Sequence, residues 1–184
     1  MARTAGRSAE DTRRLILDTA IRLVGRKGTA VPVSEIAAEA GISKGGLLYH
    51  FPSKEALLHT LASDLMAQFR DQVHASAATE PPSPGRLTRA YVRVSFADAG
   101  DVHRLRDSIA LASHLMFEPG LAELAQQDAT QWREELHADG LDPAVVRLVI
   151  AASDGSISAP LWGAILDDSD RERLEASLLD LATP

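Results

Sequence analysis

The sequence predicts an all-α protein in which an N-terminal three-helix helix-turn-helix domain is joined by a long helix to an α-helical bundle. The chain has 184 residues, of which 45% are hydrophobic but only 4% aromatic. Its apolar residues are mostly Ala, Leu, Val and Ile, a composition that favours packing of helix on helix over a β-sandwich. Apolar residues also recur every three to four positions, the spacing of one helical face.

The first helix is expected over residues 9–27, after a polar arm of residues 1–7 that carries Arg3 and Arg7. Ser8, followed three residues later by Asp11, can cap its start, and Gly28 can end it. One face of this segment carries apolar side chains at helical spacing: Ile16, Ala20, Leu23 and Val24.

Two short helices are expected next, over residues 33–40 and 44–51. Gly41 can adopt the left-handed conformation of a tight turn between them. Ser43 can cap the second of these helices, whereas Pro32 begins the first without a side-chain cap. Pro52 then ends the pair.

A long fourth helix, capped by Ser53, is expected over residues 54–76, with apolar side chains at steps of four residues: Leu57, Leu61, Leu65 and Phe69. Residues 79–85, with three prolines and a glycine, read as a linker. Five further helices follow the linker. Pro119 begins the third of these five and Pro143 begins the fourth, and Asp168 or Ser169 caps the last. The five helices are expected over residues 86–98, 102–117, 119–137, 143–166 and 168–181.

The two short helices have the layout of a helix-turn-helix, in which the second helix places its first side chains in the DNA major groove. Ser43 and Lys44 can then bond to phosphates or base edges, and two glycines let the backbone approach closely. Tyr49 and His50 lie one turn later, and Lys54 begins the next helix, where phosphate binding is favoured. The expected DNA-binding residues are Ser43, Lys44, Gly45, Gly46, Tyr49, His50 and Lys54.

Some of these residues have a structural role as the alternative to DNA contact. Tyr49 and Phe51 can serve as core residues, with the Tyr49 ring buried and its hydroxyl exposed. His50 can be a solvated surface residue, and the glycines can relieve crowding. Arg13 and Arg14 on the first helix are further candidates for phosphate contacts, together with the arm.

The charge of the chain is unevenly distributed. The net charge is −7, but residues 1–54 carry nine Lys and Arg against five Asp and Glu, a balance of +4, which leaves −11 for the remainder. A basic head on an acidic body would orient the head toward phosphates. The alternative is a chance asymmetry of solvated helix faces.

The segment EIAAEAGISKGGLLYHFPSKEALL strongly resembles the signature of TetR (tetracycline-repressor-like) regulators. The resemblance covers the first four helices and rests on Ile36, Ala37, Ala40, Gly41, Ser43, Leu48, Tyr49, Phe51, Lys54 and Leu57. It implies a homodimer that binds a palindromic operator, usually as a repressor, and is released by a small-molecule effector. Gly46 departs from the family pattern, which often has a hydroxyl residue there, so one expected DNA contact is missing.

The division expected from the sequence is a DNA-binding domain over residues 1–54 and a ligand-sensing and dimerisation domain over residues 55–184. Candidate ligand-binding residues are the aromatic, Met and His side chains of the second domain, although plain core positions are the alternative. They are Phe69, Tyr91, Phe96, His114, Met116, Phe117, Trp132 and Trp162. The surplus of apolar residues over 142–166 and 168–182 indicates a four-helix dimer interface.

Other classes of protein are disfavoured by the sequence. There is no cysteine, no His pair at i, i+4 and no nucleophile, phosphate-loop or metalloprotease motif, so we expect no enzyme, no metal site and no cofactor. No secretory signal and no uninterrupted apolar span is present, which predicts a cytoplasmic protein without a membrane partner. The alternative function is a helical small-molecule-binding protein or enzyme with a vestigial DNA-binding head.

Overall fold

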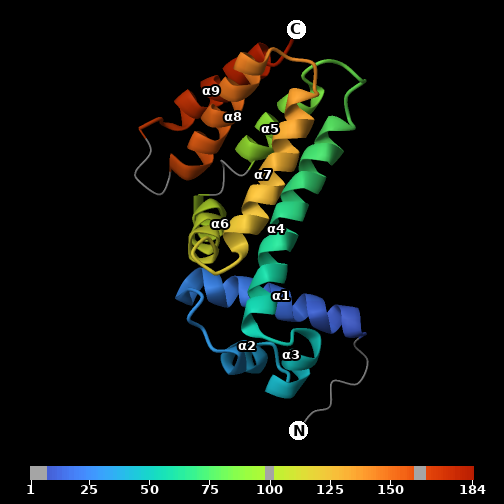
Figure 1. Cartoon of the computed structure of the whole chain (residues 1–184). Helices are drawn as coiled ribbons and strands as arrows, with labels where there is room; N and C mark the ends of the chain where they lie inside the picture. The colour runs from blue at the N-terminus through green and yellow to red at the C-terminus, as the bar shows by residue number, and fades with distance from the viewer. Residues whose placement is uncertain (1–7, 98–101, 160–164) are drawn as a thin grey trace. The chain divides into compact units, whose positions relative to one another are not determined.

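The structure, a computed structural model, describes residues 8–97, 102–159 and 165–184. Within these ranges the chain forms α-helices and no strand, which confirms the all-α prediction (Figure 1). The helices are α1 (Ala9–Lys27), α2 (Val33–Glu39), α3 (Lys44–His50), α4 (Lys54–Ala77), α5 (Arg86–Ala97), α6 (Val102–Leu115), α7 (Leu121–His137), α8 (Pro143–Ser158) and α9 (Asp168–Leu181). Within the described residues, no helix is both long and apolar enough to cross a membrane.

The chain forms two compact units. The N-terminal unit consists of Met1–Asp64 with Ala110–Ala122, and the C-terminal unit consists of Leu65–Ile109 with Glu123–Pro184. Helix α4 therefore contributes residues to both units. The functional division expected after residue 54 stays a prediction.

The core of the N-terminal unit is built from the apolar stripes of its first four helices. The large apolar side chains that are at most 1% exposed include Ile16, Val24, Ile36, Leu47, Phe51, Leu57 and Leu61. α2 packs against both α1 and α3. The burial of these residues, which supplies most of the stability of such a unit, fixes α3 on its neighbours.

The ends of the N-terminal helices follow the predicted capping residues. Ser8 and Asp11 form a reciprocal capping box at the start of α1. Ser43 Oγ accepts from the Gly46 N–H at 3.0 Å, and Ser53 Oγ accepts from the Ala56 N–H at 3.1 Å. α2 has Pro32 at its start and no side-chain cap, also as expected.

Glycine supplies the turn between α2 and α3. Gly41 has a φ of +68°, in the left-handed region that other residues rarely adopt. The Gly41 N–H donates to the Ala38 carbonyl at 3.0 Å, and the Ile42 N–H donates to the Ala37 carbonyl at 2.9 Å. The turn is thus held by backbone hydrogen bonds, and α3 starts in a defined direction.

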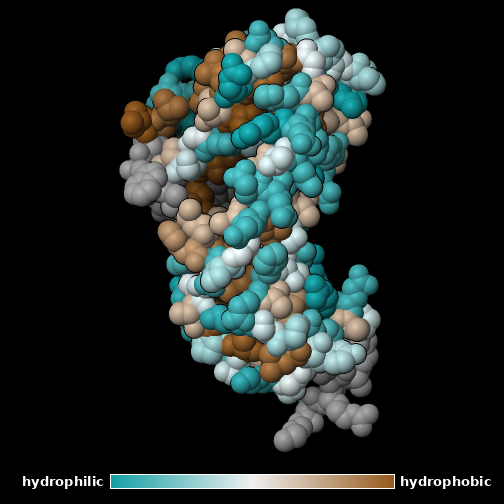
Figure 2. All heavy atoms as spheres, in the orientation of Figure 1, coloured by the Kyte–Doolittle hydropathy of each residue, from teal (hydrophilic) through white to brown (hydrophobic). Residues whose placement is uncertain are grey.

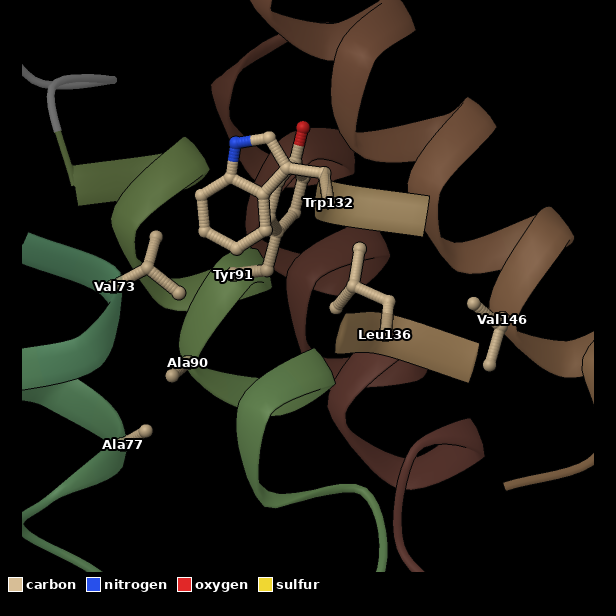
Figure 3. Close-up of a cluster of buried hydrophobic side chains, with 7 residues drawn as sticks. All are labelled: Val73, Ala77, Ala90, Tyr91, Trp132, Leu136 and Val146. Atoms are coloured by element: carbon tan, nitrogen blue, oxygen red, sulfur yellow. The ribbon is translucent and has the colours of Figure 1, made fainter. Parts of the chain in front are cut away.

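The C-terminal unit contains two apolar clusters. The first, shown in Figure 3, gathers Val73, Ala77, Ala90, Tyr91, Trp132, Leu136 and Val146 from α4, α5, α7 and α8. The second gathers Val92, Phe96, Val149 and Leu178, where α5 packs against α8 and α9. α5 contributes to both clusters and is the central helix of this unit.

Some helix ends differ from the prediction. α7 begins at Leu121 and not at Pro119, because Gly120 has a φ of +80° that no helix includes. α8 ends at Ser158, whereas the prediction continued to about residue 166; residues 160–164 of that prediction lie outside the described residues. The last helix is capped by Asp167, which accepts from the Asp170 N–H, and not by Asp168 or Ser169.

Candidate functional site

The exposed surface of α3 brings together most of the residues predicted to bind DNA. Ser43, Lys44, Gly45 and Tyr49 are exposed, whereas Gly46 and His50 are half-buried. Leu47 and Phe51 are buried in the core and hold the helix from the opposite side. The leading turn of α3 therefore presents hydroxyl, ammonium and glycine backbone groups outward.

Tyr49 is exposed over 83% of its surface, so the expectation that its ring is buried is wrong. Its position on a seven-residue helix explains this, because Leu47 and Phe51 already occupy the inward positions. The ring lies edge to face with that of its neighbour His50, with 5.2 Å between ring centroids. Phe51, in contrast, is 1% exposed and is the core residue the sequence suggested.

Arg13 has a role in the fold that the sequence did not reveal. Its guanidinium lies over the Phe51 ring, 4.4 Å from the centroid, and it also donates to the His50 carbonyl at 3.4 Å. This cation–π contact and hydrogen bond connect α1 to the end of α3. Arg13 therefore holds the C-terminal end of α3 against α1.

The cations of this unit differ in whether they are paired. Arg14 is paired with Asp18 at 3.3 Å, and Lys27 is paired with Glu35. Lys44 and Lys54 form no ion pair within the described residues. The Lys44 ammonium is therefore not neutralised by a described carboxylate, whereas Lys54 interacts electrostatically with its neighbour Glu55. Arg3 and Arg7 lie outside the described residues.

The two glycines of α3 are not required by crowding inside the protein. A Cβ at Gly45 would have no neighbour closer than Ser43 Oγ at 4.0 Å, an ordinary contact. A Cβ at Gly46 would approach the same oxygen to 3.3 Å. Two glycines in a helix cost about 2 kcal/mol relative to alanine. No contact among the described residues therefore requires a glycine at position 45.

The C-terminal unit contains a pocket of about 590 Å³. Figure 2 shows hydrophobic side chains in a hollow beside the hydrophilic surface of α7. The lining residues come from α4, α5, α7 and α8: Met66, Phe69, Tyr91, Ala125, Asp128, Ala129, Trp132, Arg133, Leu136, His137, Val146, Arg147, Ile150, Ala151 and Asp154.

Three predicted ligand-binding residues meet in this pocket. Phe69, Tyr91 and Trp132 lie edge to face, with ring centroids between 5.3 and 5.9 Å apart. Such edge-to-face pairs stabilise one another beyond the area they bury. The three rings form an aromatic wall, of which Figure 3 shows Tyr91 and Trp132.

The other predicted ligand-binding residues are not among the residues that line this pocket. Phe96 is 4% exposed and belongs to the second apolar cluster. His114, Met116 and Phe117 are part of the N-terminal unit, where Met116 and Phe117 are exposed. Trp162 lies outside the described residues.

Sequence reasoning missed the charged residues of the pocket. Asp154 accepts a hydrogen bond from the Tyr91 hydroxyl at 2.8 Å. Burial raises the pKa of the Asp154 carboxyl, and burial and the nearby carboxylate raise the pKa of Tyr91. Arg147 and Asp154 interrupt the most apolar stretch of the chain seven residues apart, on one helix face. These two charges in an otherwise apolar helix were the sequence feature that could have indicated a polar site.

Arg70 organises the wall behind Trp132. Its guanidinium lies 4.2 Å from the Trp132 ring centroid and donates to Asp128 at 2.7 Å and to Glu135. His74 contacts the other oxygen of Glu135 at 2.9 Å. Among the described residues, no group of His, Cys, Asp and Glu is arranged to hold a metal ion. The pocket is thus an aromatic cavity with fixed charges at its wall.

Comparison with known families gives two matches. Residues 85–183 match the family model described as "Tetracyclin repressor-like, C-terminal domain". Residues 16–61 match the model described as "Bacterial regulatory proteins, tetR family". The first match alone covers more than half of the chain, and the second contains α2 and α3.

Individual relatives are similar mainly in part of their length. The chain is 39% identical over 85 residues to the HTH-type transcriptional regulator BetI of Rhizobium meliloti, covering 46% of this chain and 41% of that protein. It is 33% identical over 99 residues to the HTH-type transcriptional regulator EthR of Mycolicibacterium smegmatis, covering 53% of this chain and 46% of that protein. The matches thus span under half of the length of these relatives.

Solved structures are similar over nearly the whole chain, and one example has 28% sequence identity. The multidrug binding protein EbrR complexed with malachite green superposes with a TM-score of 0.68 at 28% identity, covering 94% of this chain and 98% of that one.

Proposed function

Because this chain belongs to the tetracycline-repressor-like (TetR) family of bacterial regulatory proteins, we propose that it is a ligand-responsive transcriptional regulator that binds double-stranded DNA. The observation that carries the proposal is the outward-facing leading turn of α3, with Ser43, Lys44 and Tyr49 exposed and no internal reason for Gly45.

The DNA-binding residues we propose are Ser43, Lys44, Gly45, Gly46, Tyr49, His50 and Lys54. Ser43 uses its oxygen as an acceptor for the Gly46 N–H, so its hydroxyl hydrogen is free to donate to a phosphate. Lys44 supplies charge to the same groove, and Gly45 lets the backbone approach the duplex. Lys54 at the start of α4 adds a second phosphate contact, helped by the helix terminus.

We assign ligand sensing to the aromatic pocket of the C-terminal unit. Its volume suits a small organic molecule. The structural likeness to EbrR, which was crystallised with malachite green, supports an organic effector. α4 carries Lys54 at one end and Phe69 at the pocket, so it is the element through which binding at the pocket would change DNA affinity.

A homodimeric repressor on a palindromic operator in the cytoplasm is the form of regulator we propose. A single α3 contacts few base pairs, and two copies about 34 to 36 Å apart multiply affinity. Leu148 on α8 and Leu181 on α9 are 57% and 46% exposed, which suits a partner surface. Val146 and Val149 are buried within the chain, so the apolar surplus is smaller than the sequence suggested.

The test is DNA binding at increasing salt, with a duplex that the protein selects from a random-sequence pool. We expect affinity to fall steeply with salt, and Lys44→Ala to weaken binding and reduce the salt slope by about 1. Lys27→Ala removes the same charge at a position already paired with Glu35 and serves as the control. Sequence-blind binding, or equal losses in both variants, would contradict the proposed site.

A further inference from the structure

One carboxylate of the aromatic pocket has no cationic partner. Asp128 is paired with Arg70 at 2.7 Å, but Asp154 forms no ion pair within the described residues. The Tyr91 hydroxyl donates to Asp154 Oδ1 at 2.8 Å, which fixes the carboxylate, and no other described residue donates to Oδ2. The pocket therefore holds a positioned carboxylate that forms no ion pair with any described residue.

The surroundings of Asp154 make this charge costly. Although the residue as a whole is exposed, the carboxyl group faces the pocket, and loss of hydration raises its pKa. Tyr91, only 9% exposed, and Ile150 and Ala151 on the same helix supply an apolar environment. A carboxylate that loses part of its hydration in this way is stabilised when an opposite charge is placed beside it.

The other charges of the pocket lie elsewhere along its wall. Arg147 precedes Asp154 by seven residues on α8, which corresponds to about 10 Å along the helix axis. That distance is comparable to the screening length in physiological salt. Arg133, His137 and Arg147 also line the pocket and are exposed, as Asp154 is, but none of them forms an ion pair with Asp154. Asp154 differs from them in that the Tyr91 hydroxyl holds its carboxylate in place.

We propose that the pocket takes an organic cation, an amine or quaternary ammonium with an aromatic or apolar body, whose charge pairs with Asp154. The body of such a ligand would contact the wall formed by Phe69, Tyr91 and Trp132, and its cation would reach the free Oδ2 of Asp154. The inference rests on the proposed sensing role of this pocket.

The test compares three probes of one shape and different charge on the full chain: 2-(1-naphthyl)ethylamine, 2-(1-naphthyl)ethanol and 1-naphthaleneacetate. Titration calorimetry should show the amine binding about tenfold more tightly than the alcohol, with the carboxylate weakest. Asp154→Asn keeps the shape and an acceptor for the Tyr91 hydroxyl. It should lower the affinity for the amine to that for the alcohol and leave the alcohol unchanged.

Arg147→Gln is the matched control, because it removes a charge from the same helix face. It should raise the amine's affinity, by about fivefold at most. Preference for the carboxylate, equal effects of Asp154→Asn on amine and alcohol, or failure of the amine to bind would each overturn the proposal.

A parallel titration of duplex DNA separates this inference from the proposed function. Binding of the amine through Asp154 with no change in DNA affinity would support the ligand class and contradict the sensing role. Salt-dependent DNA binding with no preference for the amine would do the opposite.

Discussion

Arg89 is a buried cation whose hydrogen-bonding groups are all engaged. The residue is 8% exposed. It donates to Glu80 Oε2 through two nitrogens, at 3.1 and 2.7 Å, and to Ser83 Oγ at 2.9 Å. It also donates to the carbonyls of Pro84 at 3.0 Å and Ala182 at 2.7 Å. One side chain thus connects the linker before α5 with the segment after α9.

Replacing Arg89 should destabilise the C-terminal unit strongly. Arg89→Ala leaves the Glu80 carboxylate short of a partner and two carbonyls unpaired, which costs about 3 to 5 kcal/mol by the usual effect of breaking a buried pair. Arg93→Ala removes another partner of Glu80, but Arg93 is 40% exposed, so it should cost under about 1 kcal/mol. Urea unfolding of both variants measures the difference. Similar losses would show that burial of Arg89 is not decisive.

Glu80 should make the stability of the protein fall in acid. Its hydrogen bonds to Arg89 lower the pKa of the Glu80 carboxyl below the ordinary value of 4.5. Because the folded-state pKa is lower than the unfolded one, this stabilisation is complete above about pH 4.5 and is lost as the pH falls through the folded-state pKa. Thermal unfolding from pH 3 to 7 should show a weaker pH dependence in Glu80→Gln than in the parent chain. Identical pH profiles would contradict this assignment.

At the residue scale, contacts between neighbours in sequence were predictable and distant ones were not. Ser8, Ser43 and Ser53 cap their helices as expected, since a cap depends only on the next three residues. The contacts of Arg13 with Phe51 and of Arg89 with Ala182 join residues far apart in sequence, and no local pattern announces them.

The proposed role of the glycines of α3 is to let its backbone approach DNA closely, at a cost in helix stability. Gly45→Ala should raise the free energy of unfolding by about 0.5 to 1 kcal/mol, because alanine favours the helix and its Cβ has room. The same methyl group should weaken binding to the selected duplex, because it separates the backbone from the DNA. Unfolding and duplex binding are measured on one preparation.

Gly155 in α8 supplies the control for Gly45. A Cβ there meets nothing within 4 Å, so Gly155→Ala should bring a similar gain in stability and no change in DNA binding. If Gly45→Ala also leaves DNA binding unchanged, close approach of α3 to the duplex is refuted.

At the element scale, helices bounded by strong local signals were predicted to within a residue or two. α1 and α4 have capping serines and unbroken apolar stripes, and their bounds agree with the structure. α7 and α8 are shorter than predicted: Gly120, just before α7, has a positive φ, and α8 ends at Ser158. Helix-breaking residues near an apolar run decide where the run stops being helical.

The exposed apolar residues of α8 and α9 bear on the assembly of the whole molecule. Leu148→Glu should weaken the proposed dimer about tenfold or more, because it places a charge in an apolar contact. Since Leu148 is 57% exposed, the fold itself should be unaffected. Phe117→Glu is the control, as Phe117 is 83% exposed in the N-terminal unit. Sedimentation velocity distinguishes monomer from dimer, and equal behaviour of the two variants would argue against this surface.

For the whole molecule, the sequence predicted the fold class and the position of the helix-turn-helix but only part of the pocket. The aromatic side chains predicted as ligand-binding candidates include three that line the pocket, Phe69, Tyr91 and Trp132. Asp154 and Arg147 were not predicted, since a cavity arises from how helices α4, α5, α7 and α8 are spaced, and sequence periodicity shows only which face of each is apolar.

The position of Trp132 gives the pocket an intrinsic optical signal. The indole lies at the cavity wall between Arg70 and two other rings, and the chain has only one other tryptophan, Trp162. In a Trp162→Phe background, all indole emission would come from the cavity. Occupancy could then be followed by fluorescence quenching in dilute solution, without a label and before any natural effector is identified.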